Sequence, residues 1–143
     1  MRLSPGGSYG TMSDSDPHAT FGYGARRLDG YDLAYLHVIE PRIRGNEDTR
    51  ASASAVSTAD MRRVYTGGTI IAAGGFTAES AQRSIDEAIA DLVAFGRLFI
   101  SNPDLPERLR TGAPLNRYDR TTFYGGDARG YTDYAFYRPT TAA

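Results

Sequence analysis

Short apolar runs alternate with stretches of helical periodicity along most of the chain, and each run ends at a glycine, a proline or a charged residue. Three runs have the length of a buried strand: residues 34–40 (AYLHVIE), 68–73 (GTIIAA) and 91–95 (DLVAF). A fourth and shorter extended stretch opens the chain at residues 1–4. The runs lack a regular polar alternation, which is typical of strands covered on both faces.

The stretches between these runs predict helices. They cover residues 17–28 (or as far as 31), 58–65, 77–90 and 103–110. Asp16, Thr58 and Thr77 are the expected N-caps of the first three, since short oxygen-bearing side chains accept the unpaired N–H groups of a first turn. Strand followed by helix, four times over, indicates βαβ units around a parallel sheet. Residues 41–57 are polar and predict a long mobile loop of the kind that often serves function.

Two turns at strand ends carry candidate chemistry. Gly74-Gly75 and Gly96-Arg97 each follow a predicted buried strand and precede a helical stretch. Glycines let backbone N–H groups approach a phosphate, and an arginine adds a bidentate cation. The alternative is a pair of ordinary strand-to-helix turns with a surface arginine. The usual nucleotide fingerprints, GxGxxG and GxxxxGK[ST], are absent from the sequence.

The other candidates each have a plain structural interpretation. Arg2 is either a cation at the rim of the site or an exposed terminal arginine. His37 is expected to be a core histidine satisfied by a neighbour rather than a base or a metal ligand, and His18 a surface residue. Two distant histidines without a carboxylate cluster make a weak metal signal, so no metal is expected.

Charged and aromatic clusters complete the set. Glu40, Arg42 and Arg44 flank a strand end and predict an internal salt-bridge network. Asp104 and Arg108 predict an i,i+4 pair on a solvated helix face. The tail is rich in aromatic side chains, which could line an apolar pocket or plug a sheet end. They are Phe123, Tyr124, Tyr131, Tyr134, Phe136 and Tyr137.

Composition narrows the function classes. The 143 residues bound the chain to one domain, and the net charge of −1 gives no sign of a nucleic-acid or membrane surface as the main partner. All 16 basic residues are arginine. The chain has no cysteine, which excludes disulfides and thiolate metal sites and fits a cytoplasmic protein.

Six motifs in this order resemble a known family. They are RLSP at 2–5, YLHVIEPR at 35–42, IIAAGGF at 70–76, FGRLFISNPDLPERL at 95–109, PLNRYDRTTFYGG at 114–126 and GYTDY at 130–134. Together they are similar to the C-terminal half of the Old Yellow Enzyme family, the FMN-dependent ene-reductases. The resemblance covers nearly the whole chain and implies an α/β fold: strands five to eight, with their helices, of a (β/α)8 TIM barrel.

The resemblance also implies roles for single residues. Arg2 matches an arginine at the flavin pyrimidine edge, where a cation would stabilise the anionic reduced flavin. Gly74-Gly75 and Gly96-Arg97 match the phosphate-binding turns after strands seven and eight, as expected for barrels of this kind. Tyr124 matches an aromatic residue near the substrate pocket, and the loop at 43–57 matches a variable loop beside it.

The implied reaction has two half-steps: NAD(P)H reduces FMN, and the flavin gives a hydride to a small electron-poor alkene. The family's catalytic His/Asn or His/His pair and its proton-donating tyrosine have no counterpart in this chain, so no catalytic residue is assigned. The chain is therefore expected to be a truncated product, one partial domain over 1–143, with open strand edges that could pair with a second copy or with the N-terminal half. The alternative is an inactive half-barrel with at most weak FMN-phosphate binding.

Overall fold

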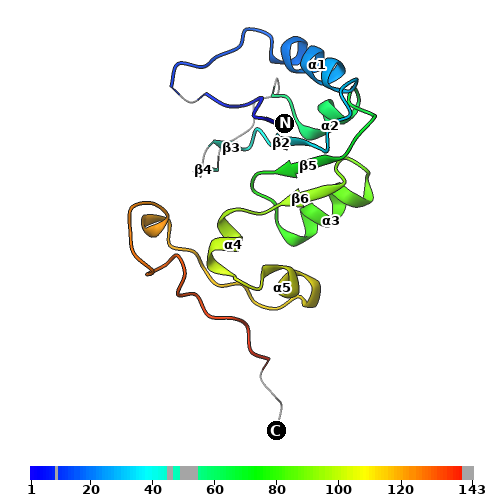
Figure 1. Cartoon of the computed structure of the whole chain (residues 1–143). Helices are drawn as coiled ribbons and strands as arrows, with labels where there is room; N and C mark the ends of the chain where they lie inside the picture. Colours follow the sequence, from blue (N-terminus) through cyan, green and yellow to red (C-terminus); the bar gives the residue numbers. More distant parts are fainter. Residues whose placement is uncertain (9, 45–46, 49–54, 140–143) are drawn as a thin grey trace. The chain divides into compact units, whose positions relative to one another are not determined.

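The computed structural model describes residues 1–8, 10–44, 47–48 and 55–139. The chain divides into two compact units, Met1–Ala94 and Phe95–Ala143 (Figure 1). Of the helices within the described residues, none combines the length and the apolarity that a membrane crossing demands.

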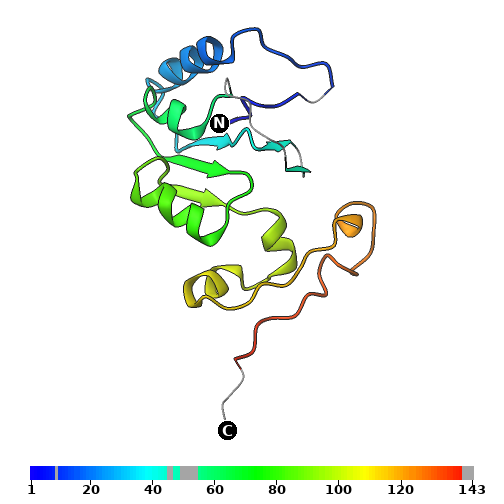
Figure 2. The ribbon, with the colours of Figure 1, turned by 180° about the vertical axis from the view of Figure 1, so that it is seen from behind.

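The first unit is built on a four-stranded parallel sheet (Figure 2). Its strands are β1 (Arg2–Leu3), β2 (Leu36–Ile39), β5 (Ile70–Ala73) and β6 (Leu92–Ala94), in the order β1-β2-β5-β6. Its helices are α1 (Pro17–Leu28), α2 (Thr58–Arg62) and α3 (Ala78–Asp86). Each strand pairs in parallel with the next strand of the sheet along the chain, which confirms the predicted α/β alternation.

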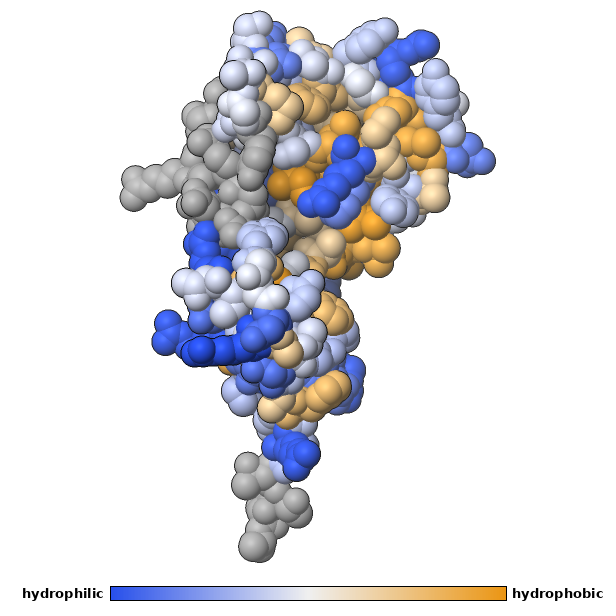
Figure 3. Space-filling model, turned by 60° about the vertical axis from the view of Figure 1, so that its left-hand side comes forward, coloured by the Kyte–Doolittle hydropathy of each residue, from blue (hydrophilic) through white to orange (hydrophobic). Residues whose placement is uncertain are grey.

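The two faces of this sheet differ in burial. Leu36 pairs with Ile70 and Val38 with Ala72, so the four side chains share one face, and all four are fully buried. The other face carries the row His37, Ile71 and Leu92, in which Leu92 is 54% exposed. Apolar surface is visible over much of the first unit (Figure 3). The core of the unit therefore lies on one side of the sheet.

Helix caps follow the sequence prediction in two of three cases. The Asp16 side chain accepts from the Ala19 N–H at 3.0 Å, and Thr77 caps α3. The expectation that Thr58 caps α2 is wrong, because the cap is Ser57. Ser57 and Asp60 form a capping box, in which each side chain accepts from the other residue's backbone N–H.

The stretch predicted as a long loop contains a short antiparallel pair. The strands β3 (Ile43–Arg44) and β4 (Glu47–Asp48) pair with each other. The remainder of the predicted loop at residues 45–46 and 49–54 lies outside the described residues.

The second unit contains α4 (Arg97–Ser101), α5 (Leu105–Thr111) and a 3-10 turn at Arg120–Thr122. The prediction of a solvated helix face at Asp104 and Arg108 is half wrong. The ion pair forms, at 2.6 Å, but Arg108 is only 3% exposed. Its guanidinium also donates to the carbonyl oxygens of Pro114 at 2.7 Å and Ala135 at 2.8 Å. These hydrogen bonds connect α5 to the segments that follow it, and the segments cover the Arg108 side chain.

Candidate functional site

The Gly74-Gly75 turn lies directly after β5, at the carboxyl end of the parallel sheet. Its backbone φ angles are 111° at Gly74 and 65° at Gly75, and residues other than glycine rarely adopt such positive values. A Cβ atom at Gly75 would lie 3.1 Å from Cδ1 of Ile43, so the Ile43 side chain would have to shift to make room for it. Neither amide N–H of the turn has a hydrogen-bond partner among the described residues. The turn therefore offers backbone donors at a strand end.

Arg42 braces this turn from the end of the neighbouring strand. Its Nε–H donates to the carbonyl oxygen of Gly74 at 2.9 Å, and its guanidinium carbon lies 4.4 Å from the centre of the Phe76 ring. Glu40 is held differently: its Oε1 accepts from the backbone N–H of Thr58 at 3.0 Å and from the Thr58 hydroxyl. The predicted salt-bridge network is thus replaced, at Glu40 and Arg42, by hydrogen bonds to other partners. The Arg44 side chain lies outside the described residues.

The Gly96-Arg97 turn begins the second unit, immediately before and within the first turn of α4. Gly96 has φ −98°, which other residues can adopt, and a Cβ atom built on it meets nothing within 4 Å. The glycine is therefore not required by the local backbone, and the space beside it is open. The guanidinium carbon of Arg97 lies 5.6 Å from the centre of the Tyr118 ring, within the range of a cation–π contact.

A row of aromatic rings continues from Arg97 within the second unit. The rings of Tyr118 and Phe123 are 5.6 Å apart, and those of Phe123 and Tyr124 are 6.4 Å apart and nearly perpendicular. Phe123 is buried, whereas Tyr124 is 79% exposed. The aromatic tail thus has a buried member in Phe123 and several exposed ones, and Tyr124 is more exposed than Tyr131, Phe136 or Tyr137.

Arg2 lies on β1 in register with His37 on β2. Burial, together with the positive charges of Arg2 and the amino terminus, lowers the pKa of His37. The Nε2 atom of His37 is buried without a hydrogen-bond partner among the described residues, so the prediction of a satisfied core histidine is wrong at this atom. His18 is exposed in the first turn of α1, as expected.

The strand register brings some of the predicted residues close in the fold. Ala73 at the end of β5 pairs with Ala94 at the end of β6, so the chain leaves both strands at the same sheet edge. The Gly74-Gly75 turn belongs to the first unit, whereas Arg97, Tyr118 and Tyr124 belong to the second. In α/β proteins, phosphorylated ligands bind at turns that follow the carboxyl ends of parallel strands, which is the position of the Gly74-Gly75 turn in the first unit.

A profile of the NADH:flavin oxidoreductase / NADH oxidase family matches residues 1–116. The chain belongs to this family. It is 44% identical over 138 residues to the putative 12-oxophytodienoate reductase 11 of Oryza sativa, covering 95% of this chain and 36% of that protein. It is 42% identical over 135 residues to 12-oxophytodienoate reductase 2 of Arabidopsis thaliana, covering 94% of this chain and 35% of that protein.

Solved structures of the NADH:flavin oxidoreductases agree with this assignment. Morphinone reductase in complex with tetrahydroNAD superposes with a TM-score of 0.80 at 44% identity, over 96% of this chain and 35% of that one. The Old Yellow Enzyme of Trypanosoma cruzi superposes with a TM-score of 0.81 at 35% identity, over 96% of this chain and 34% of that one. The chain therefore spans about a third of the length of these relatives. FMN is the cofactor of the family.

Taken within its own unit, each turn carries groups of a kind that the phosphate end of FMN could use. Gly74 and Gly75 leave their amide N–H groups without partners among the described residues, and Gly96 has open space beside its backbone. Arg97 follows Gly96 directly in the chain and carries a guanidinium group. Unpaired backbone donors and a guanidinium are the groups that a phosphate dianion requires.

Arg42 is the residue of this site whose role reasoning from the sequence missed. The sequence places it two residues beyond the apolar run of β2, where a charge at a strand end could signal a contact with the next strand end. Its partner is the backbone carbonyl oxygen of a residue 32 positions further along the chain, and no sequence pattern identifies such a partner.

Proposed function

We propose that this chain forms strands five to eight of a (β/α)8 barrel and contributes the phosphate-binding part of an FMN site. The observation that carries the proposal is the Gly74-Gly75 turn at the end of β5, which has positive φ angles and amides that bond no group in the described part of the chain. Four parallel strands in chain order and the superposition on relatives about three times as long support the partial barrel. The proposed domain is 1–143 as one part of that barrel.

In the proposed site, Gly74, Gly75, Gly96 and Arg97 hold the FMN phosphate. Arg2 supports the flavin edge with its positive charge, which would favour negative charge on the ring. Tyr124 is exposed and borders the substrate pocket in the proposal. FMN supplies the hydride chemistry when bound, and the side chains of this chain bind and orient it.

We propose NAD(P)H-dependent reduction of activated C=C bonds as the reaction of the assembled barrel. The relatives named above, 12-oxophytodienoate reductases and morphinone reductase, support an ene-reductase class. No catalytic residue is assigned within the chain, so the proposal places the chemistry in an assembly with the remaining barrel strands. The proposed partners are NAD(P)H, a small electron-poor alkene, and either the rest of the barrel or a second copy.

The test is flavin binding and turnover. The purified chain is titrated with FMN, and bound flavin is followed by its absorbance and fluorescence. NADPH oxidation with 2-cyclohexenone is then measured for the chain alone and for a chimera in which morphinone reductase supplies the amino-terminal strands. The proposal predicts flavin binding by both and turnover by the chimera alone. A chain and a chimera that both stay colourless with excess FMN would contradict it and support an inactive remnant.

A further inference from the structure

The first unit contains a small groove of about 210 Å³ beside α2 and α3. Its lining includes Glu40 and Arg42, which follow β2, and residues at the start of α2. The residues that α3 contributes are spaced three and four positions apart, so they lie on one face of the helix: Ser80, Arg83, Ser84 and Glu87. The groove is therefore formed entirely within Met1–Ala94.

Two hydrogen-bond donors of this lining lack a partner. The Arg42 guanidinium is held by the Gly74 carbonyl and the Phe76 ring, yet its Nη2 atom is buried and bonds no group in the described part of the chain. Ser84 is 6% exposed, and its hydroxyl makes no hydrogen bond with the described residues. A buried donor without an acceptor costs about 1–3 kcal/mol, so an acceptor is expected beside these two groups.

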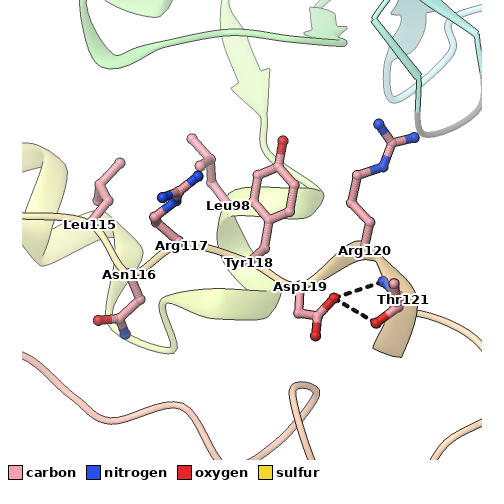
Figure 4. Close-up of a pocket in the computed structure, with 8 residues that line it drawn as sticks. All are labelled: Leu98, Leu115, Asn116, Arg117, Tyr118, Asp119, Arg120 and Thr121. Carbon is pink, nitrogen blue, oxygen red and sulfur yellow. Dashed lines mark hydrogen bonds between the residues drawn. The ribbon is translucent and has the colours of Figure 1, made fainter.

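A wider groove in the second unit does not have this feature. Its volume is about 830 Å³, and it is lined by Leu98 and residues 115–121 (Figure 4). Its carboxylate, Asp119, already accepts from the Thr121 N–H at 2.9 Å and from the Thr121 hydroxyl at 2.7 Å. Among the described residues, none of the buried polar atoms without a partner belongs to this lining. The unpartnered donors therefore point to the groove of the first unit.

The charged groups of the small groove indicate the kind of acceptor. Arg42 and Arg83 face it as cations, and neither forms an ion pair within the described residues. Glu40 and Glu87 also line it, and Oε1 of Glu40 is engaged by the N–H and the hydroxyl of Thr58. Because the two signs balance in number, the groove does not favour a dianion such as a phosphate. A carboxylate, which carries one charge and only accepts hydrogen bonds, matches the unpartnered donors.

We propose that this groove binds a small aliphatic carboxylate, with Arg42 and Ser84 as its hydrogen-bond donors. The Nη2–H group of Arg42 and the Ser84 hydroxyl donate to the carboxylate oxygens. The short apolar chain of the ligand lies against Ala59, Phe76 and Ile89, which complete the lining. The inference goes beyond the proposed function, because it uses neither the flavin nor the amides of the Gly74-Gly75 turn and holds whether or not the chain binds FMN.

The test is an NMR titration of the isotope-labelled full chain with butyrate and with butyramide, a neutral ligand of similar shape. We expect butyrate to cause saturable shifts in the backbone amide signals of Phe76, Ser80 and Ser84. Butyramide should bind at least about tenfold more weakly, because it lacks the charge that strengthens the hydrogen bonds from Arg42. A response to butyrate that does not saturate, as from a groove that holds water only, overturns the inference. Equal affinity for the two ligands overturns it as well.

Two variants locate the binding site. Ser84→Ala keeps α3 intact, since alanine is a good helix former, and should weaken butyrate binding by about tenfold. Arg42→Met should abolish saturable binding. The matched control is Arg63→Met, which removes a 75% exposed arginine outside the groove and should bind butyrate like the parent. If Ser84→Ala binds butyrate as tightly as the parent, the inference is wrong, whether or not Arg42→Met folds.

Discussion

The Nε–H of Arg42 donates a hydrogen bond of 2.9 Å to the carbonyl oxygen of Gly74, so a side chain from the end of β2 fixes the turn that ends β5. The same guanidinium packs on Phe76, one residue past the turn. The Gly74 carbonyl and the Gly75 amide N–H belong to one planar peptide unit, so holding the carbonyl also fixes the direction of that amide. The contact therefore links strand pairing in the sheet to the geometry of the proposed phosphate site.

Replacing Arg42 by Met should loosen this turn. The loss of a hydrogen bond from a charged donor should cost about 1–3 kcal/mol of unfolding free energy. We expect FMN affinity to fall by a larger factor than riboflavin affinity, since only the phosphate contacts the turn in our proposal. Urea unfolding and flavin titration measure the two effects. Arg63→Met is the control, because the Arg63 side chain is 75% exposed in a surface pair with Asp60. Equal effects of both variants on FMN affinity would contradict the bracing role.

Gly75→Ala should destabilise the chain for two reasons. Its φ of 65° disfavours alanine, and the new Cβ would come within 3.1 Å of Ile43. Together we expect about 1–3 kcal/mol of lost stability. Gly24→Ala is the matched control: Gly24 lies inside α1, and a Cβ atom added there would meet nothing within 4 Å. That change should stabilise by about 0.5–1 kcal/mol, and thermal melts of the two variants should therefore shift in opposite directions.

Arg108→Met should be the most damaging arginine substitution in the second unit. The side chain is 3% exposed and bonds Asp104, the Pro114 carbonyl and the Ala135 carbonyl. Its removal leaves buried acceptors without a donor and should cost about 3 kcal/mol or more. Arg110→Met, with a side chain that is 71% exposed, should change stability by less than about 0.5 kcal/mol. Limited proteolysis should cut the tail of the Arg108 variant faster, and equal cleavage rates would argue against its anchoring role.

Stability should fall in mild acid because of His37. Burial and the charge of Arg2 lower its pKa in the folded chain, so the unfolded chain binds the proton more readily. Stability from this group is present above the unfolded value of about 6.5 and is lost as the pH falls below it towards the folded pKa. Urea midpoints at pH 7.5 and pH 5 measure the slope. His37→Gln should flatten it, whereas His18→Gln, at an exposed position of α1, should not.

The sequence predicts the positions of the strands well. It predicts poorly which groups the arginine side chains bond in the fold. Apolar runs and glycine boundaries locate β2, β5 and β6 to within two residues at each end. The expected cover on both faces of these strands is not seen throughout, because Leu92 on β6 is 54% exposed. From the sequence, Arg42 and Arg108 are each predicted to pair with a nearby charged residue. That prediction leaves out hydrogen bonds that each side chain makes in the fold. In the fold both donate to backbone carbonyl oxygens, which every residue possesses and which no pattern marks.

The helices show the same division between local and tertiary signals. Asp16 and Thr77 cap their helices as predicted, because capping depends on neighbours three residues away. Thr58 is the predicted N-cap of α2, but Ser57 holds that position. The backbone N–H of Thr58 instead donates to the carboxylate of Glu40, which follows β2. No pattern in the sequence predicts α4, since a five-residue helix directly after a strand has too few residues for a periodic signal.

The phosphate assignment is the central claim, and the most direct measurement is the affinity of the chain and its Arg97→Ala variant for FMN and for riboflavin. We predict that the chain binds FMN about tenfold or more tightly than riboflavin and that Arg97→Ala removes most of that difference, leaving riboflavin affinity unchanged. Arg110→Ala, on an exposed face of α5, should behave like the parent. Equal affinity of the parent for the two flavins, or an Arg97→Ala variant with unchanged FMN affinity, would contradict the account.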